Sequence, residues 1–352
     1  MNLYSNELYC KDVDVVGSIN LPWSMLSNKS LLVSGASGLI GSFLIDVLLS
    51  KNINDDLNCT VYALGRDEDK LKARFSKYVH DKHLIFIKYN IQEPLILNDL
   101  GKVDYVLHLA SNTHPFLYST DPIGTILTNV FGLKNMLDFA VEHNATRFAF
   151  ASSNEMYGEN RGDVEFFDEE YCGYINCNTL RAGYPESKRC GEALCQAYRT
   201  QNNLDVVIPR LTRTFGPTMS MSDTKAASQF IKKGVLGEDI ILKSKGTQYF
   251  SYTYVADAVS GLLTVILKGE SGEAYNIADE SGDIMLKDFA SIVAGISGKN
   301  VVYEIPDEIE AAGYSKATKA RLDGSKLRDL GWKPQYSIKL GIERTISILK
   351  SI

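Results

Sequence analysis

The chain has 352 residues, of which 45% are hydrophobic and 23% are charged, a composition typical of an ordinary globular protein with a buried core. It excludes a disordered, collagenous or coiled-coil chain, and no apolar run approaches the roughly 20 residues of a membrane-spanning helix. The net charge of -6, with lysines and arginines spread along the chain, argues against a general nucleic-acid binder.

The cysteines and the N-terminus indicate the compartment. The six cysteines include no Cys-x-x-Cys pair, and the N-terminus lacks the basic and apolar regions of a secretory signal. We therefore expect reduced thiols, a cytoplasmic location and no membrane partner. No cluster of His, Cys, Asp or Glu has metal-ligand spacing, so we expect no metal site.

Strands and helices alternate from residue 30 onward. Strands are predicted at 31–34, 60–64, 84–88, 105–109, 147–152 and 205–209, and helices up to 49 and at 67–75, 125–143 and 187–200. This alternation predicts an α/β fold with a Rossmann-type doubly wound parallel sheet of about six or seven strands. The alternation loosens beyond Gly216, and the chain ends in a predicted helix at 338–350. We therefore expect an N-terminal extension at 1–28, a dinucleotide-binding domain at 29–215, and a smaller C-terminal substrate lobe at 216–352 that is partly interleaved with it.

A glycine-rich turn joins the first strand to the first helix. Gly35, Gly38 and Gly41 follow the spacing Gly-x-x-Gly-x-x-Gly, in which small residues let the backbone approach a pyrophosphate beside a helix N-terminus. In this context a simple tight turn is the weaker alternative. The motif predicts a dinucleotide site that also includes Ser37, Leu39 and Ile40.

The end of the second predicted strand departs from the usual dinucleotide pattern. An acid that binds the ribose is expected there, whereas the sequence has Gly65-Arg66-Asp67. Arg66 is either a contact for the 2′-phosphate of NADP or a solvated charge at a helix start. NAD is therefore the expected cofactor, with NADP as the competitor.

Three side chains suggest proton and hydride chemistry. Tyr184 and Lys188 share one helix face, where an ammonium would stabilise the phenolate and lower the tyrosine pKa, so that the phenolate removes a hydroxyl proton. Because Tyr-x-x-x-Lys is also common on ordinary half-exposed helices, a third group is needed. Ser153, after the strand at 147–152, would hydrogen-bond the substrate hydroxyl, and Glu155 would act as an acid or base. A turn cap and a surface acid are the alternatives for these two residues.

Several motifs occur in the order found in one family. They are Gly35-x-x-Gly38-x-x-Gly41, His108-Leu109-Ala110-Ser111, Thr128-Asn129, Ser152-Ser153-x-Glu155-x-Tyr157-Gly158, Tyr184-x-x-x-Lys188, Arg213-Thr214-Phe215-Gly216-Pro217, Tyr254-Val255-x-Asp257 and Tyr275-Asn276-Ile277. Over nearly its whole length the chain resembles the extended short-chain dehydrogenase/reductase family of nucleotide-sugar epimerases, dehydratases and decarboxylases. The segments 108–140 and 181–194, with an Arg-x-x-Tyr-x-x-x-Lys-Arg run, look closest to the UDP-glucuronate decarboxylase branch. The resemblance implies a tightly held nicotinamide cofactor that oxidises C4 of a nucleotide-diphosphate sugar.

The resemblance also implies roles for single residues. Tyr184 matches the general base, Lys188 the ribose-binding lysine and Ser153 the C4-hydroxyl donor. Glu155 matches the Glu of dehydratases and decarboxylases and favours a lyase, with a 4-epimerase or a non-catalytic nucleotide sensor as alternatives. Asn154 stands where one dehydratase branch has an acid, which weakens that branch. The remaining implied cofactor contacts are Arg66, Asn90, Ile91, Leu109, Ala110, Ser111, Asn129, Tyr184 and Lys188, and the implied substrate contacts are Ser111, Asn154, Arg213, Lys225 and Tyr249.

The sequence departs from the family pattern at two places. Phe250 stands where the family has an arginine that contacts the substrate diphosphate and, in decarboxylases, lies near the reacting carbon. This change weakens the decarboxylase branch unless Lys225, Lys243 or Lys245 replaces the charge, although a lysine lacks the bidentate fork. The other departure is Asn90-Ile91, in place of an Asp-hydrophobic pair at the adenine.

The resemblance further implies a homodimer, built by packing helices at 123–143 and 186–200 of two subunits into a four-helix bundle. The alternative is that the chain's own sheet covers these apolar faces. His114 and Arg161 are expected to be loop residues rather than an acid and a carboxylate clamp.

Overall fold

An eight-stranded sheet, parallel throughout, organises the computed structural model, which describes residues 3–97, 100–113, 115–304 and 317–352. Seven of its strands follow the order β11-β7-β5-β4-β1-β2-β3, and β6 pairs with β7. Their bounds are β1 (Ser30–Ser34), β2 (Thr60–Gly65), β3 (Leu84–Lys88), β4 (Tyr105–His108), β5 (Arg147–Phe150), β6 (Ser152–Ser153), β7 (Val206–Leu211) and β11 (Ala274–Ile277). This order confirms the predicted Rossmann-type α/β fold.

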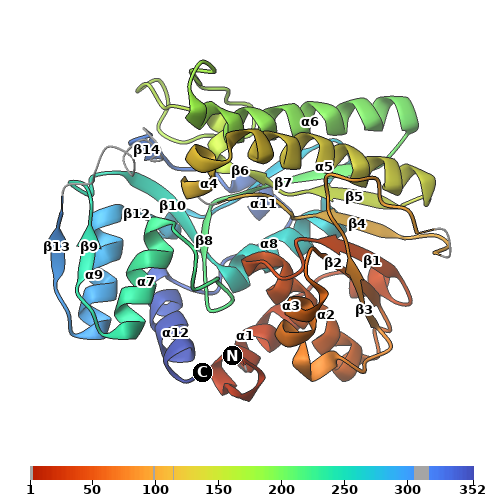
Figure 1. Cartoon of the computed structure of the whole chain (residues 1–352), viewed down its shortest axis with the longest axis horizontal. Coiled ribbons are helices and arrows are strands. Elements are labelled where there is room, and N and C mark those ends of the chain that lie inside the picture. The colour runs from red at the N-terminus through yellow and green to blue at the C-terminus, as the bar shows by residue number, and fades with distance from the viewer. Residues whose placement is uncertain (1–2, 98–99, 114, 305–316) are drawn as a thin grey trace.

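Helices cover both faces of this sheet (Figure 1). The helices α5 (Pro122–Glu142) and α6 (Gly183–Asn202) pack against each other on one face. The helices α2 (Leu39–Asp55) and α8 (Val255–Lys268) pack against each other on the opposite face. Along β1, Leu31 and Val33 belong to one hydrophobic core and Leu32 to the other, as expected from the alternation of side chains along a strand.

Three element boundaries differ from the prediction for local reasons. The predicted strand at 147–152 breaks at Ala151, whose carbonyl oxygen accepts a hydrogen bond from Lys188 Nζ at 2.8 Å. The helix predicted to begin at 125 begins at Pro122, because the Asp121 side chain caps it by accepting from the Gly124 N–H, an arrangement with Pro in the first turn that favours helix initiation. The helix α6 begins at Gly183, before Tyr184, so Tyr184 and Lys188 both lie within its first turns.

The chain after residue 216 contributes to both parts of the molecule. A smaller lobe contains α7 (Ala226–Leu236), α9 (Leu286–Ser297), α12 (Ile338–Lys350), and a second sheet of β12 (Asp283–Met285), β10 (Tyr249–Tyr254) and β14 (Lys319–Ala320), with β8 (Arg213–Phe215) paired to β10. A two-stranded sheet of β9 (Ile240–Leu242) and β13 (Val301–Tyr303) lies beside α9. Yet β11 joins the main sheet and α8 packs beneath it. A domain boundary between residues 215 and 216 stays a prediction.

The N-terminal helix α1 (Glu7–Gly17) is tied to the end of the chain. Its buried Asp12 accepts hydrogen bonds from the hydroxyls of Tyr254 at 2.7 Å and Tyr336 at 2.6 Å, and pairs with Arg344 at 2.6 Å. Figure 1 shows the two termini close together at the base of the molecule. The first residues therefore pack into the frame that joins the sheet to the smaller lobe.

Within the described ranges, no helix has the length and apolar character needed to cross a bilayer. All six cysteines lie in those ranges, and each is free.

Candidate active site

A cavity of ≈ 480 Å³ opens at the carboxyl ends of the main strands. It lies where the strand order reverses between β1 and β4, the usual ligand position of an open α/β sheet. Nineteen of the candidate site residues line it, and they are Gly35, Ser37, Gly38, Leu39, Ile40, Gly41, Arg66, Asn90, Ile91, Leu109, Ala110, Ser111, Ser153, Asn154, Glu155, Tyr184, Lys188, Arg213 and Lys225. Asn129 and Tyr249 are not among the lining residues.

The glycine turn packs closely against neighbouring backbone at the cavity. Gly35 has φ +72°, and a Cβ there would lie 2.8 Å from the Ala110 nitrogen. A Cβ on Gly41 would lie 2.4 Å from the Gly35 carbonyl oxygen. Because α2 starts beside Gly38 without a side-chain cap from any described residue, its first N–H groups can bind an anion. These residues fit the pyrophosphate of a dinucleotide.

Arg66 and Asn90 line the cavity on the same side as the glycine turn, which we call the cofactor half. Arg66 is exposed at the cavity rim. The neighbouring Asp67 caps the helix α3 (Glu68–Arg74) by accepting from the Lys70 N–H at 3.0 Å. The Asn90 side chain donates to Glu93 at 3.0 Å and accepts from the Gln92 N–H at 3.3 Å. Local turns therefore already use the polar groups of Asp67 and Asn90, whereas Arg66 remains an exposed cation.

Ser153, Tyr184 and Lys188 meet at the centre of the cavity. Lys188 Nζ lies 4.7 Å from the ring centroid of Phe150 and 5.9 Å from that of Tyr184, and burial lowers the pKa of Lys188 to about 8. The Ser153 hydroxyl accepts from the Glu155 N–H at 3.2 Å. Ser153 is thus a turn cap that also lines the cavity, and its contact with a substrate hydroxyl stays a prediction.

The acid–base state of Tyr184 corrects one expectation. Burial, and then the charge of Glu155, raise the pKa of Tyr184 to about 12, although hydrogen bonds with the hydroxyls of Ser153 and Ser111 lower it in part. The predicted lowering by Lys188 is wrong for this arrangement, because the lysine ammonium donates to the Ala151 carbonyl instead of the phenol.

Two residues that the sequence left without a role organise Glu155. Arg181 Nη2 pairs with Glu155 Oε2 at 2.6 Å, and its guanidinium lies 4.6 Å from the centroid of the Tyr118 ring. Tyr118 in turn stacks on Tyr184 at 4.9 Å. Arg181 stands three residues before Tyr184 in the Arg-x-x-Tyr run, so a signal for it existed, whereas Tyr118 has none. The stack holds the carboxylate and the phenol in fixed positions.

Lys225 and Arg213, the two cations expected to contact the substrate, differ from each other in their partners. Lys225 Nζ pairs with Asp223 at 2.9 Å and donates to Thr113 at 3.2 Å. Arg213 instead places its guanidinium 3.5 Å from the centroid of the Phe250 ring, and its buried Nη1 has no hydrogen-bond partner in the described part of the chain. The Phe250 ring on β10 therefore supports the guanidinium of Arg213, which comes from the neighbouring strand β8.

The remaining predicted residues lie outside the cavity lining. Asn129 is buried, accepts from the Ser111 hydroxyl at 2.7 Å and donates to Ser187 at 2.8 Å, so it supports a lining residue. Tyr249 lies under the guanidinium of Arg321 at 4.7 Å. Arg161 lies over the Tyr174 ring at 3.8 Å in a loop, and His114 is outside the described residues.

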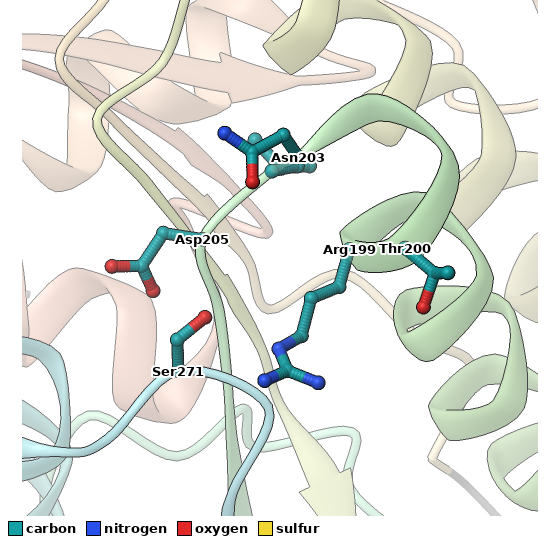
Figure 2. A pocket seen from close by; sticks show the side chains of 6 residues that line it. Arg199, Thr200, Asn203, Asp205 and Ser271 are labelled. Carbon is teal, nitrogen blue, oxygen red and sulfur yellow. The ribbon is translucent and has the colours of Figure 1, made fainter.

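A second hollow of ≈ 390 Å³ lies at the opposite edge of the sheet, where β7 begins (Figure 2). It is lined by Arg199, Thr200, Asn203, Leu204, Asp205 and Ser271. Asp205 is already paired with Arg147 at 2.9 Å, and none of the candidate residues lies here. In the ranges that the structure describes, no group of three or more His, Cys, Asp or Glu could hold a metal ion.

Comparison with known proteins places the chain among sugar-nucleotide enzymes. The model of the NAD dependent epimerase/dehydratase family matches residues 31–278. UDP-glucuronic acid decarboxylase 6 from Arabidopsis thaliana is 32% identical over 90% of this chain and 87% of its own length. UDP-glucuronic acid decarboxylase 1 from Xenopus tropicalis is 32% identical over 90% of this chain and 71% of its own length.

Solved structures agree in fold. A dTDP-glucose 4,6-dehydratase from Streptomyces venezuelae, determined with NAD bound, has a TM-score of 0.78 and 25% identity, covering 92% of this chain and 97% of that one. A UDP-glucuronic acid 4-epimerase from Bacillus cereus, in complex with UDP-glucuronic acid and NAD, has a TM-score of 0.76 at 23% identity, covering 92% and 99%. With the glycine turn and the Ser153, Tyr184 and Lys188 set in one cavity, the chain belongs to the NAD dependent epimerase/dehydratase family.

Proposed function

We propose that this protein is an NAD-dependent decarboxylase that converts a UDP-uronic acid to a UDP-pentose through a C4 ketone. The observation that carries the proposal is the single cavity that joins the glycine turn to Ser153, Tyr184 and Lys188 and adds Glu155 at the same end. The UDP-glucuronic acid decarboxylases that match over 90% of the chain support the choice of substrate.

The chain's residues would carry the proton steps. Tyr184 removes the proton from the C4 hydroxyl, and Ser153 hydrogen-bonds the C4 oxygen. Bound NAD would supply an acceptor for the hydrogen and electron pair that leave C4, and would return them at the end of the cycle. The charged Lys188, beside Tyr184 on α6, would bind the cofactor ribose.

The ketone then weakens the bond to the carboxylate. With C4 oxidised, the carboxylate on C5 becomes that of a β-keto acid, so the bond between C5 and C6 breaks and carbon dioxide leaves. The electron pair remains as an enolate across C4 and C5, whose oxygen accepts hydrogen bonds from Ser153 and Tyr184. C5 then takes up one proton, and C4 is reduced again.

Glu155 is the group we assign to proton transfer at C5. Among the described residues that line the cavity, it is the one carboxylate. Its ion pair with Arg181 at 2.6 Å fixes its position. A positioned carboxylate, acting directly or through one water, is a competent proton-transfer group.

Product analysis tests the proposal. Protein with NAD and UDP-glucuronate should yield a UDP-pentose that has lost carbon dioxide, detected by mass spectrometry. A product that retains the carboxylate with inverted C4 would indicate a 4-epimerase. Loss of water from dTDP-glucose, with no reaction of the uronate, would indicate a dehydratase, and binding without any reaction would indicate a sensor.

We further propose a homodimer through α5 and α6. Their outer side exposes apolar residues, including Ile123, Ile126 and Phe131 on α5 and Leu180 just before α6, with exposed fractions of 71%, 40%, 51% and 67%. Exposed apolar side chains of this kind favour self-association. Light scattering should give a dimer mass that falls to a monomer mass in Phe131→Glu, whereas a monomer mass for the unaltered protein would reject the dimer.

A cytoplasmic location is also part of the proposal. Cys172, Cys177 and Cys190 are exposed and free, which suits a reducing compartment. Cell fractionation with an antibody to the protein tests this, and recovery outside the cytosolic fraction would contradict it.

A further inference from the structure

Arg213 has an uncompensated charge at the cavity. It lies on β8, opposite Tyr252 of β10, and it lines the cavity. Its guanidinium plane rests 3.5 Å from the centroid of Phe250, yet no carboxylate of the described residues forms an ion pair with it, and its buried Nη1 has no hydrogen-bond partner among them. Phe250 thus holds the guanidinium without satisfying its donors.

The nearby acid cannot supply the missing partner. Burial lowers the pKa of Arg213, and the charges of Tyr252 and then Glu155 offset this lowering in part, so Glu155 lies near the guanidinium. However, Glu155 Oε2 is already paired with Arg181 at 2.6 Å. Arg213 is half-buried, and leaving its buried Nη1 without a partner is costly, so an anion bound in the cavity would compensate the charge of Arg213.

We infer that Arg213 binds the carboxylate of the substrate sugar and selects a uronic acid over a neutral hexose. The inference rests on the proposed function, because it takes the cavity end with Tyr184 and Ser153 as the place of C4. In a pyranose ring the C6 carboxylate is attached beside C4, whereas the diphosphate at C1 lies across the ring. The charge of Glu155 acts on both Tyr184 and Arg213, and all three line the cavity, so Arg213 lies on the C4 side and C6 is the nearer anionic group.

This assignment gives Phe250 a role. Phe250 of β10 orients an arginine that comes from the adjacent strand β8. A planar guanidinium stacked on a ring keeps its edge N–H groups free for a carboxylate, which a lysine ammonium cannot match in geometry. Because the carboxylate leaves as carbon dioxide, we expect Arg213 to affect KM more than kcat.

Binding measurements separate the carboxylate from the rest of the substrate. Calorimetry on protein loaded with NAD would compare UDP, UDP-glucose and UDP-glucuronate. Arg213→Gln should lose roughly 10- to 100-fold in affinity for UDP-glucuronate and keep its affinity for UDP and UDP-glucose. Arg213→Lys should fall between, and adding Phe250→Arg to Arg213→Gln should recover part of the loss.

Arg199→Gln is the matched control. Arg199 lines the hollow at the opposite edge of the sheet (Figure 2), so its loss should change none of the three affinities. Equal losses for UDP and UDP-glucuronate in folded Arg213→Gln would place Arg213 at the diphosphate, and an unchanged profile would leave it without a ligand. Either result overturns the inference. Since the comparison needs no turnover, it stays decisive even if product analysis shows an epimerase.

Discussion

The two halves of the cavity recognise their ligands by different means. On the cofactor half, Gly35 and Gly41 let the turn pack closely against neighbouring backbone, beside the N-terminus of α2, which no described side chain caps. On the sugar half, charged and aromatic side chains are stacked in pairs, Arg181 on Tyr118 and Arg213 on Phe250. Backbone amides suit the pyrophosphate of a dinucleotide. Charged side chains in fixed positions can instead distinguish one sugar from another. We therefore expect specificity and chemistry to reside in the sugar half.

The largest effect should come from Tyr184, which lies where the halves meet. We predict that Tyr184→Phe lowers kcat by roughly 1000-fold or more, since the ring keeps its packing but loses the proton acceptor. NAD affinity should stay within a few fold of wild type. Steady-state kinetics and calorimetry measure both quantities.

A matched tyrosine tests whether this effect is local. Tyr303, on β13, is 61% exposed, and Tyr303→Phe should leave turnover unchanged. Substantial turnover in Tyr184→Phe would remove that phenol from the mechanism.

Next in size is a change that damages only the cofactor half. A Cβ on Gly35 would meet the Ala110 nitrogen at 2.8 Å while φ remains at +72°, so Gly35→Ala must displace the turn. NAD affinity should fall by at least about 30-fold. Gly295→Ala, at a position where the described neighbours leave open space, should bind NAD normally, and normal affinity in a folded Gly35→Ala would show that the turn does not contact the cofactor.

A smaller effect should follow from loosening the sugar half. Arg181→Gln frees Glu155, and we predict a fall in kcat of about 10-fold with little change in NAD affinity. Because the two residues act as one unit, adding Glu155→Gln should cost little beyond Glu155→Gln alone. Lys233→Gln, which breaks an exposed ion pair with Glu238, is the control. Multiplicative losses in the double variant would mean that Arg181 and Glu155 work separately.

The smallest effect concerns a carboxylate outside both halves. Asp257, buried on α8, accepts from the N–H groups of Gln335 at 2.7 Å and Tyr336 at 3.0 Å, and burial raises its pKa to about 7 from 3.8. Between these values the folded protein keeps a proton that the unfolded chain has lost. Stability should therefore fall as pH rises from about 4 to about 7, by at most about 1.4 kcal/mol per pH unit from this group.

Denaturant unfolding across that pH window measures this slope. Asp257→Asn should flatten it without altering kcat, whereas the exposed Asp288→Asn should keep the wild-type slope. An unaltered slope in Asp257→Asn would assign the pH dependence to other groups.

The same contrast explains how far the sequence could predict the structure. The strands, the glycine turn and the spacing of Tyr184 and Lys188 are local patterns, so periodicity and residue type predicted them closely. Tyr118, the Phe250 platform for Arg213 and the raised pKa of Tyr184 depend on side chains that are distant in sequence. The motif assigns Asn129 to the cofactor, whereas its buried side chain bonds Ser111, and a cofactor contact stays a prediction. Local patterns therefore predicted the cofactor half better than the sugar half.

The most direct test of the central claim, that oxidation at C4 activates the bond between C5 and C6, is NMR of the product formed from UDP-glucuronate and NAD in heavy water. We predict release of carbon dioxide and a UDP-pentose with one solvent deuterium at C5 and protium at C4, because C5 is protonated from solvent and C4 regains its own hydrogen. A product that keeps its carboxylate, or a pentose without deuterium at C5, would contradict the claim.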